Sequence, residues 1–354
     1  MLTKRRHRFR PLLKLLYITI GLLLLALVGV GYQIVGMVQD RKQYPPPGQL
    51  IDIGGYKLHL YCTGEGSPTV ILDAMGPGWS IYWAQVQPEI AKVTRVCSYD
   101  RAGFGWSDAG RLPRVGRRMA GELHQLLTNG GISGPYVLVG HSLGGFVARL
   151  YRQAHPNDVV GIVLVDAGHE RQFEQTEFRK FAAPGKTLFP IVRAMTALGL
   201  TRLLISRDLA PSFFTTQEAG VPADIRPLLR AGWTQSRYFK TLAYEGAALE
   251  GTAGQTGMAG SLGNLPLTVI TATGPTWWPD MPTSVDPTRF RKMWLKFQSD
   301  LTKLSTNSRQ VFADRSSHFI NFDQPELIIE AIQEMIASQI HPQPGEQFSP
   351  MSSR

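Results

Sequence analysis

The chain of 354 residues contains only two cysteines, Cys62 and Cys97. No Cys-x-x-Cys motif occurs, so no metal cluster can be drawn from them. Each cysteine lies in an apolar run that is typical of a β-strand. Our first expectation is therefore two small residues buried in the core.

Acidic residues are absent from the start of the chain, where six basic residues precede Leu15: Lys4, Arg5, Arg6, Arg8, Arg10 and Lys14. The formal net charge is +10, so subtracting these six leaves +4 for the rest of the chain. No basic patch with interleaved aromatic residues follows in the body of the sequence. The composition therefore does not indicate nucleic-acid binding.

Charge of either sign is also absent from Leu15 to Gln39. Because about 20 apolar residues in a helix cross a bilayer core, we predict a transmembrane signal anchor over residues 15–38. The positive-inside rule then places the basic N-terminus, residues 1–14, in the cytoplasm and the remainder outside it. A cleaved secretory signal is the alternative, since Gly29-Val30-Gly31 offers a cleavage site. A Pro-rich linker follows over residues 39–49.

One stretch organises the rest of the chain. Four apolar or aromatic residues from Tyr136 run into Gly140, and helical spacing resumes from Phe146. Between them lies Gly-x-Ser-x-Gly, with Ser142 at its centre. A nucleophile on a sharp strand-to-helix turn needs small neighbours such as Gly140 and Gly144, because other side chains would collide there. The alternative is a turn in which Ser142 merely caps the helix.

This segment resembles the nucleophile elbow of the α/β-hydrolase superfamily. A second segment, Asp100-Arg101-Ala102-Gly103-Phe104-Gly105-Trp106-Ser107, is similar to the loop after the fourth strand of that family. The resemblance implies an α/β fold with a doubly wound, mostly parallel sheet and a helical cap insertion, here preceded by one transmembrane helix. In that fold the strands of Cys62 and Cys97 are neighbours, so the two cysteines could pair if the domain is exported.

The resemblance covers roughly residues 50–340, and it implies these boundaries: a hydrolase core over residues 50–166 and 265–340, a helical cap over 167–264, and a disordered tail over 341–354. In the core we expect a helix from Trp83 to Val93. In the cap we expect helices with Gly-rich breaks near Gly251–Gly260. The cap is rich in aromatic residues, which implies an apolar binding cavity.

Serine catalysis of this type needs a nucleophile, a general base and an acid, in the chain order Ser, acid, His. Ser142 and His318, which precedes the final helix, match the first and last of these positions. Two residues are candidates for the acid. Asp166 follows the sixth strand, where some relatives carry the acid, and we favour it over Asp280, which lies three residues beyond the more common position. His169 and Glu170 are expected to be exposed polar residues at the hinge of the cap.

The oxyanion that forms during acyl transfer needs two backbone donors. The resemblance implies the N–H of Leu143, directly after the nucleophile, and a residue after the third strand. Ala74-Met75 stands where the family usually has His-Gly, so Gly76 is the nearest match for this second donor. Pro77 has no N–H and cannot serve.

Together these motifs predict a membrane-anchored serine hydrolase that cleaves an ester-type bond of an apolar acyl substrate, with no cofactor and no metal. Its partners would be the small-molecule ester and the membrane. The alternatives are other chemistry of a Ser triad on the same fold, namely C–C hydrolysis, perhydrolysis or acyl transfer, and a non-catalytic binding domain. The sequence leaves the oligomeric state open.

Overall fold

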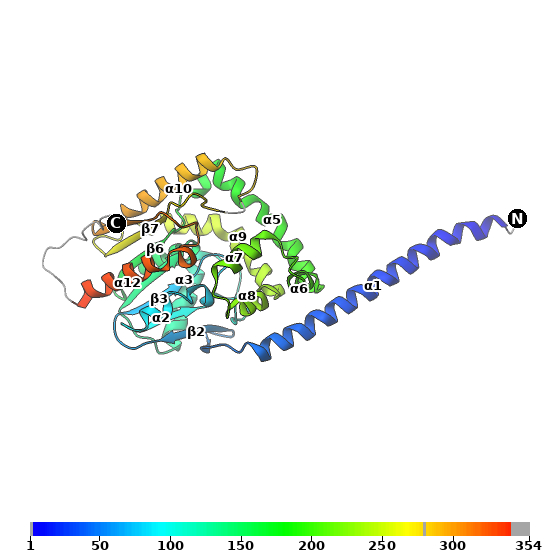
Figure 1. Cartoon of the computed structure of the whole chain (residues 1–354), viewed down its shortest axis with the longest axis horizontal. Helices are drawn as coiled ribbons and strands as arrows, with labels where there is room; N and C mark the ends of the chain where they lie inside the picture. The colour runs from blue at the N-terminus through cyan, green and yellow to red at the C-terminus, as the bar shows by residue number, and fades with distance from the viewer. Residues whose placement is uncertain (1–2, 279–280, 341–354) are drawn as a thin grey trace.

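The computed structural model describes residues 3–278 and 281–340. Its first element, α1 (Thr3–Gln43), is a single long helix whose N-terminal part projects away from the rest of the molecule (Figure 1). Residues 12–43 of this helix are long and apolar enough to cross a membrane, and a stretch of 18 residues within them has a mean hydropathy of 2.4. The helix extends past residue 38, so the first residues of the predicted linker are helical. The tail over residues 341–354 lies outside the described residues.

The central sheet has eight strands: β1 (Gln49–Asp52), β2 (Lys57–Thr63), β3 (Thr69–Asp73), β4 (Val96–Tyr99), β5 (Tyr136–His141), β6 (Val159–Val165), β7 (Leu267–Ala272) and β8 (Ser308–Ala313). Their order is β1-β2-β4-β3-β5-β6-β7-β8. The β1–β2 and β2–β4 pairs are antiparallel and all others are parallel. The predicted fold, a doubly wound and mostly parallel sheet, is confirmed.

Helices cover both faces of the sheet, because the inner strands are apolar on both sides. On one face, α3 (Gly116–Asn129) and α4 (Leu143–Ala154) pack on the strands. On the other, the described helices are α2 (Gln87–Ile90) and α12 (Pro325–Ile340). The helix α10 (Pro287–Thr302) contributes Leu301 to the core cluster on the first face and Phe290 and Trp294 to that on the second. The helix predicted from Trp83 to Val93 is wrong: a 3₁₀ turn (Ser80–Trp83) and the four-residue α2 stand in its place. Pro88, at the start of α2, lacks the N–H that would continue the turn into a longer helix.

A helical insertion lies between β6 and β7 and covers the carboxyl ends of the strands. It comprises α5 (Thr176–Ala197), α6 (Leu200–Ser206), α7 (Ser212–Gly220), α8 (Arg226–Trp233) and α9 (Ser236–Gly257). The break predicted near Gly251–Gly260 is confirmed only at its far end, because α9 continues through Gly251 and ends at Gly257. Thr252, Ala253 and Thr256 of this last part are buried, so packing outweighs the low helix propensity of glycine.

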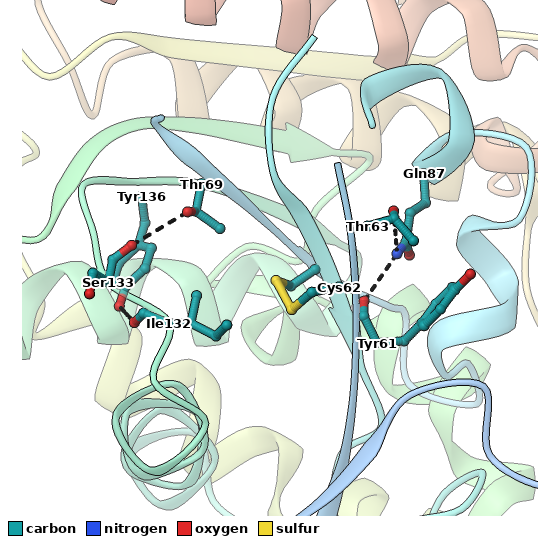
Figure 2. The surroundings of a disulfide bond; sticks show 9 residues. Tyr61, Cys62, Thr63, Thr69, Gln87, Ile132, Ser133 and Tyr136 are labelled. Atoms are coloured by element: carbon teal, nitrogen blue, oxygen red, sulfur yellow. Dashed lines mark hydrogen bonds between the residues drawn. A yellow bond between two sulfur atoms is a disulfide. The ribbon is translucent and has the colours of Figure 1, made fainter. Parts of the chain in front are cut away.

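The two cysteines form a disulfide between Cys62 of β2 and Cys97 of β4, which face each other in the antiparallel register. Figure 2 shows this bond in β2, where the carbonyl of the preceding residue, Tyr61, accepts a hydrogen bond from Gln87 Nε2 at 3.0 Å. Our first expectation of two unpaired core cysteines is therefore wrong. The pairing that we made conditional on export is the one present.

Candidate active site

Ser142 lies on a strained turn between β5 and α4, with φ of 53° and ψ of −111°. A Cβ added at Gly140 would lie 2.5 Å from backbone atoms of Gly144, and one added at Gly144 would lie 2.5 Å from the carbonyl oxygen of Asp73. Only glycine fits at both positions. The Ser142 side chain makes no capping hydrogen bond within the described chain, so the alternative of a simple helix cap lacks its defining contact.

Backbone hydrogen bonds connect this turn to the end of β6. The N–H of Ser142 donates to the carbonyl of Val165 at 3.0 Å, and the N–H of Gly168 donates to the carbonyl of Ser142 at 3.0 Å. The residue that follows Val165 is Asp166. The turn and the acid therefore lie at the same edge of the sheet.

Asp166 and His318 form a close pair, with 2.6 Å between Oδ2 of the carboxylate and Nδ1 of the imidazole. Asp166 has no exposed surface. Its carboxylate also accepts hydrogen bonds from Trp277 Nε1 at 2.7 Å, Trp294 Nε1 at 2.9 Å and the N–H of Ala272 at 3.1 Å. Donors of this number stabilise a buried negative charge, which can then orient the imidazole and stabilise its protonated form.

Asp280, the second candidate for the acid, lies outside the described residues. The described part of the same loop contributes to the His318 site through Trp277. The carbonyl of Trp277 accepts a hydrogen bond from the N–H of His318 at 2.8 Å, and the two rings are 4.8 Å apart.

His141, the residue between Gly140 and Ser142, was not predicted to have a role. Its Nε2 lies 2.8 Å from the carbonyl oxygen of His318. Because a carbonyl only accepts, Nε2 must carry the hydrogen. Burial, and then the positive charge that His318 can carry, hold the pKa of His141 well below its usual range, so this ring is neutral. The only sequence signal was its place inside Gly-x-Ser-x-Gly.

The loop after β3, which contains Gly76, is held by Arg101. The guanidinium donates to the carbonyls of Ala74 at 2.6 Å, Met75 at 2.8 Å and Gly76 at 2.9 Å, and to the carboxylate of Asp73 at 2.7 Å. With these carbonyls turned to Arg101, the loop conformation depends on one buried side chain. Leu143 opens α4, so its N–H has no acceptor within the helix.

Arg101 is also paired with the helical insertion. Its Nε lies 3.4 Å from Oε1 of Glu245 in α9, and both side chains are buried. Burial would lower the pKa of Arg101, but the charges of Glu245 and Asp73 outweigh it and raise that pKa. Sequence reasoning gave Arg101 no role at the site, because no spacing in the chain relates it to Glu245.

His169 differs from its prediction as an exposed hinge residue. It is only 5% exposed, and its ring stacks on Phe297 with 4.5 Å between the centroids. Glu170 retains partial exposure and pairs with Arg149 at 2.7 Å. Both residues therefore fasten the start of the insertion to the core.

A cavity of about 390 Å³ lies between α7 and the loop that carries His318. Ser317 and Phe319, the neighbours of His318, line it together with Thr216, Ala219 and Phe322. Among the described residues, Ser142 and His318 themselves are not part of its lining. The cavity is therefore a groove beside the His318 loop, between the insertion and the core.

The sheet order, the turn at Ser142 and the helical insertion define the α/β-hydrolase fold. Residues 70–331 match the Alpha/beta hydrolase family, which is well over half of the chain. The chain belongs to this family.

The relatives share only parts of the chain. The probable transporter efuK of Hormonema carpetanum is 33% identical over 139 residues, which are 37% of this chain and 20% of that protein. The matches to the first three curated relatives span 20%, 44% and 65% of their lengths.

Solved structures of low identity share the fold. A lipase candidate, lip1 of Acinetobacter baumannii AYE, has a TM-score of 0.63 at 16% identity, over 88% of this chain and 97% of that one. An esterase from Thermogutta terrifontis has a TM-score of 0.57 at 20% identity, over 80% of this chain and 94% of that one.

Proposed function

We propose that the protein is a serine hydrolase that cleaves an ester-type bond of an apolar acyl substrate through Ser142, His318 and Asp166. The observation that carries the proposal is the buried Asp166–His318 pair, 2.6 Å apart, at the same edge of the sheet as a serine on a strained turn. A serine hydroxyl is a weak nucleophile at neutral pH, and an oriented imidazole is the base that activates it.

In the proposed reaction, Ser142 Oγ attacks the carbonyl carbon of the ester while His318 takes the hydroxyl proton. The negative charge on the carbonyl oxygen is stabilised by the N–H groups of Leu143 and Gly76. The bond to the alcohol then breaks, and the alcohol leaves with the proton from His318. Water next gives a proton to His318 and attacks the acyl-enzyme, which releases the acid and restores Ser142.

An ester panel tests this proposal. The wild-type protein should hydrolyse p-nitrophenyl esters, with a preference for longer acyl chains over acetate if the substrate is apolar. Ser142→Ala should lose at least about a thousandfold in turnover, because the nucleophile cannot be replaced. Equal turnover by both proteins would contradict the assignment of Ser142.

We further propose that α1 anchors the protein in a membrane, with the N-terminus in the cytoplasm and the hydrolase domain outside. The charge pattern of the sequence supports this orientation. The disulfide between Cys62 and Cys97 supports it independently, because disulfides persist in oxidising compartments. Protease added to whole cells should digest the domain. A domain protected until lysis would contradict this orientation.

A further inference from the structure

The helix α1 packs along the insertion as well as preceding the domain. Gly29, Gln33, Gly36 and Asp40 recur at intervals of four, three and four residues, so they share one face of the helix. A Cβ at Gly29 would lie 2.3 Å from the carbonyl oxygen of Leu198, and one at Gly36 would lie 2.5 Å from the guanidinium of Arg202. The two glycines therefore allow the helix to lie against the α5–α6 segment, as Figure 1 also shows.

Polar contacts fix the position of the insertion along the axis of α1. Arg202 of α6 donates to Asp40 at 2.6 Å and to Gln33 Oε1 at 3.2 Å. Gln33 is 3% exposed, and its Nε2 donates to the carbonyl of Thr234 at 2.6 Å. Because one residue of α6 bonds to two turns of α1, the helix and the insertion are joined as one body.

The α5–α6 segment exposes a set of large apolar side chains beside α1. Their exposed fractions are 50% for Leu188, 53% for Ile191, 38% for Leu198, 43% for Leu200 and 42% for Leu203. Leu188 and Ile191 of α5 and Leu198, the residue after its end, are three and seven residues apart, so they form one stripe. An exposed apolar surface of this kind indicates a binding surface for protein or lipid.

The shape of the α5–α6 segment indicates that lipid, and not protein, binds this apolar surface. Taken together, α5 and α6 are long and apolar enough to cross a membrane, but they meet at an angle of 85°. The bend is at Leu198–Gly199, where Gly199 has φ of 74°. A segment with so sharp a bend is not one straight span, and its apolar corner can enter a single leaflet.

The position of the Leu198 corner along the axis of α1 also agrees with insertion into one leaflet. If the hydrocarbon region begins after Lys14, about 20 residues of helix reach its far boundary near Ile34. Gly29, which contacts Leu198, then lies about 7 Å inside that boundary, and Asp40, which binds Arg202, lies about 9 Å outside it. The apolar corner is thus at the depth of acyl chains, and the ion pair is at the depth of the headgroups.

The charge of the segment fits the same surroundings. From residue 178 to residue 207 the chain has no acidic residue and six basic ones: Arg179, Lys180, Lys186, Arg193, Arg202 and Arg207. Basic side chains around an apolar corner are typical of segments that lie in the interface of membranes with anionic lipids.

We propose that the corner formed by α5 and α6 around Leu198 is inserted in the outer leaflet of the same membrane that α1 crosses. The occupant of the apolar surface is the acyl-chain region of that bilayer. This inference rests on the proposed anchoring of α1 but not on the proposed catalysis. It places the α5–α6 part of the insertion at the membrane from which an apolar ester would come.

The test uses the full-length protein in vesicles of phosphatidylcholine and phosphatidylglycerol. Leu198→Cys and, as a second variant, Leu203→Cys are labelled with an environment-sensitive fluorophore; no free cysteine competes among the described residues. The matched control is Phe312→Cys, whose native side chain is 58% exposed on β8. The proposal predicts that nitroxides on the acyl chains remove about half or more of the emission at Leu198 and Leu203, and little at Phe312.

Flotation of the same samples separates this inference from the anchoring on which it rests. Protein that floats with the vesicles, with a label quenched at Leu198, supports both. Protein that floats but has labels equally unquenched at Leu198, Leu203 and Phe312 overturns the insertion and leaves the anchor. A blue-shifted but unquenched label at Leu198 assigns the surface to a second copy of the chain and also overturns it. Protein that does not float overturns both.

Discussion

The Nε2 atom of His141 lies 2.8 Å from the carbonyl oxygen of His318, so the residue before Ser142 is bonded to the residue proposed as its base. This bond fixes the backbone of His318 from one side, and the carboxylate of Asp166 fixes its ring from the other. The loop that carries His318 is therefore held by the same turn that carries Ser142.

Asp166→Asn tests the acid of the proposed triad. An amide at this position cannot stabilise a protonated imidazole and disfavours the required tautomer, so we expect turnover of an ester to fall by about 10⁴-fold. The measurement is kcat for the best ester of the panel, with thermal unfolding to establish that the variant is folded. The comparator is Asp280→Asn, the other acid considered from the sequence. A large loss in that variant, with Asp166→Asn unchanged, would reverse the assignment.

His141 makes the stability of the protein depend on pH. Its pKa is lowered in the folded state by burial, so the unfolded chain binds a proton more readily. The contribution of His141 to the free energy of unfolding is therefore fully present above the unfolded pKa of about 6.5. It decreases as the pH falls below that value, by up to about 1.4 kcal/mol per pH unit. Chemical unfolding at a series of pH values from 7 to 5 measures this.

The control is His141→Gln, which keeps a side-chain N–H for the carbonyl of His318 but does not titrate. In this variant, the part of the pH dependence of the unfolding free energy that comes from His141 should be absent, and most of the ester turnover should remain. If the slope of His141→Gln equals that of the wild type, the buried neutral ring is not its source.

Arg101 is predicted to position the loop of Gly76. Arg101→Lys replaces a planar group that reaches several acceptors by a single ammonium, so it cannot hold three carbonyls and Asp73 in the same way. We expect turnover to fall by about 100-fold, near the lower limit for loss of one oxyanion donor, with little change in KM. Arg111→Lys, an exposed site whose side chain donates to the carbonyl of Gly54, is the matched control. A purely structural role of Arg101 would lower thermal stability and leave kcat unchanged.

The disulfide is predicted to contribute to stability. It closes a segment of 35 residues, and loops of this size correspond to about 3–4 kcal/mol in the chain-entropy description. The double variant Cys62→Ser, Cys97→Ser should therefore unfold at lower denaturant concentration. Treatment of the wild type with reductant should reproduce the loss, while the reductant should leave the double variant unchanged. Equal stability of all three samples would contradict this prediction.

The parts of this molecule that follow from local patterns were predictable. The apolar strand before Gly140, the long uncharged segment at the N-terminus and the alternation of strands and helices each depend on neighbouring residues. Contacts between side chains far apart in the sequence could not be predicted, because no local pattern encodes them. Examples are the contact of Arg101 with Glu245 and that of Arg202 with Asp40. Gly251 was misread for the related reason that burial of α9 outweighs local propensity.

The choice between Asp166 and Asp280 shows the same limit at the site. A carboxylate at the end of a strand is consistent with a turn cap as well as with catalysis. The donors that distinguish Asp166, Trp277 and Trp294, come from more than 100 residues further along the chain.

The most direct test of the central claim is to locate the residue that a fluorophosphonate modifies. Peptide mass spectrometry of the labelled full-length protein should find the adduct on Ser142. Labelling should be absent from Ser142→Ala and strongly slowed in Asp166→Asn. An adduct on another residue, or equal labelling of the wild type and Ser142→Ala, would contradict the account.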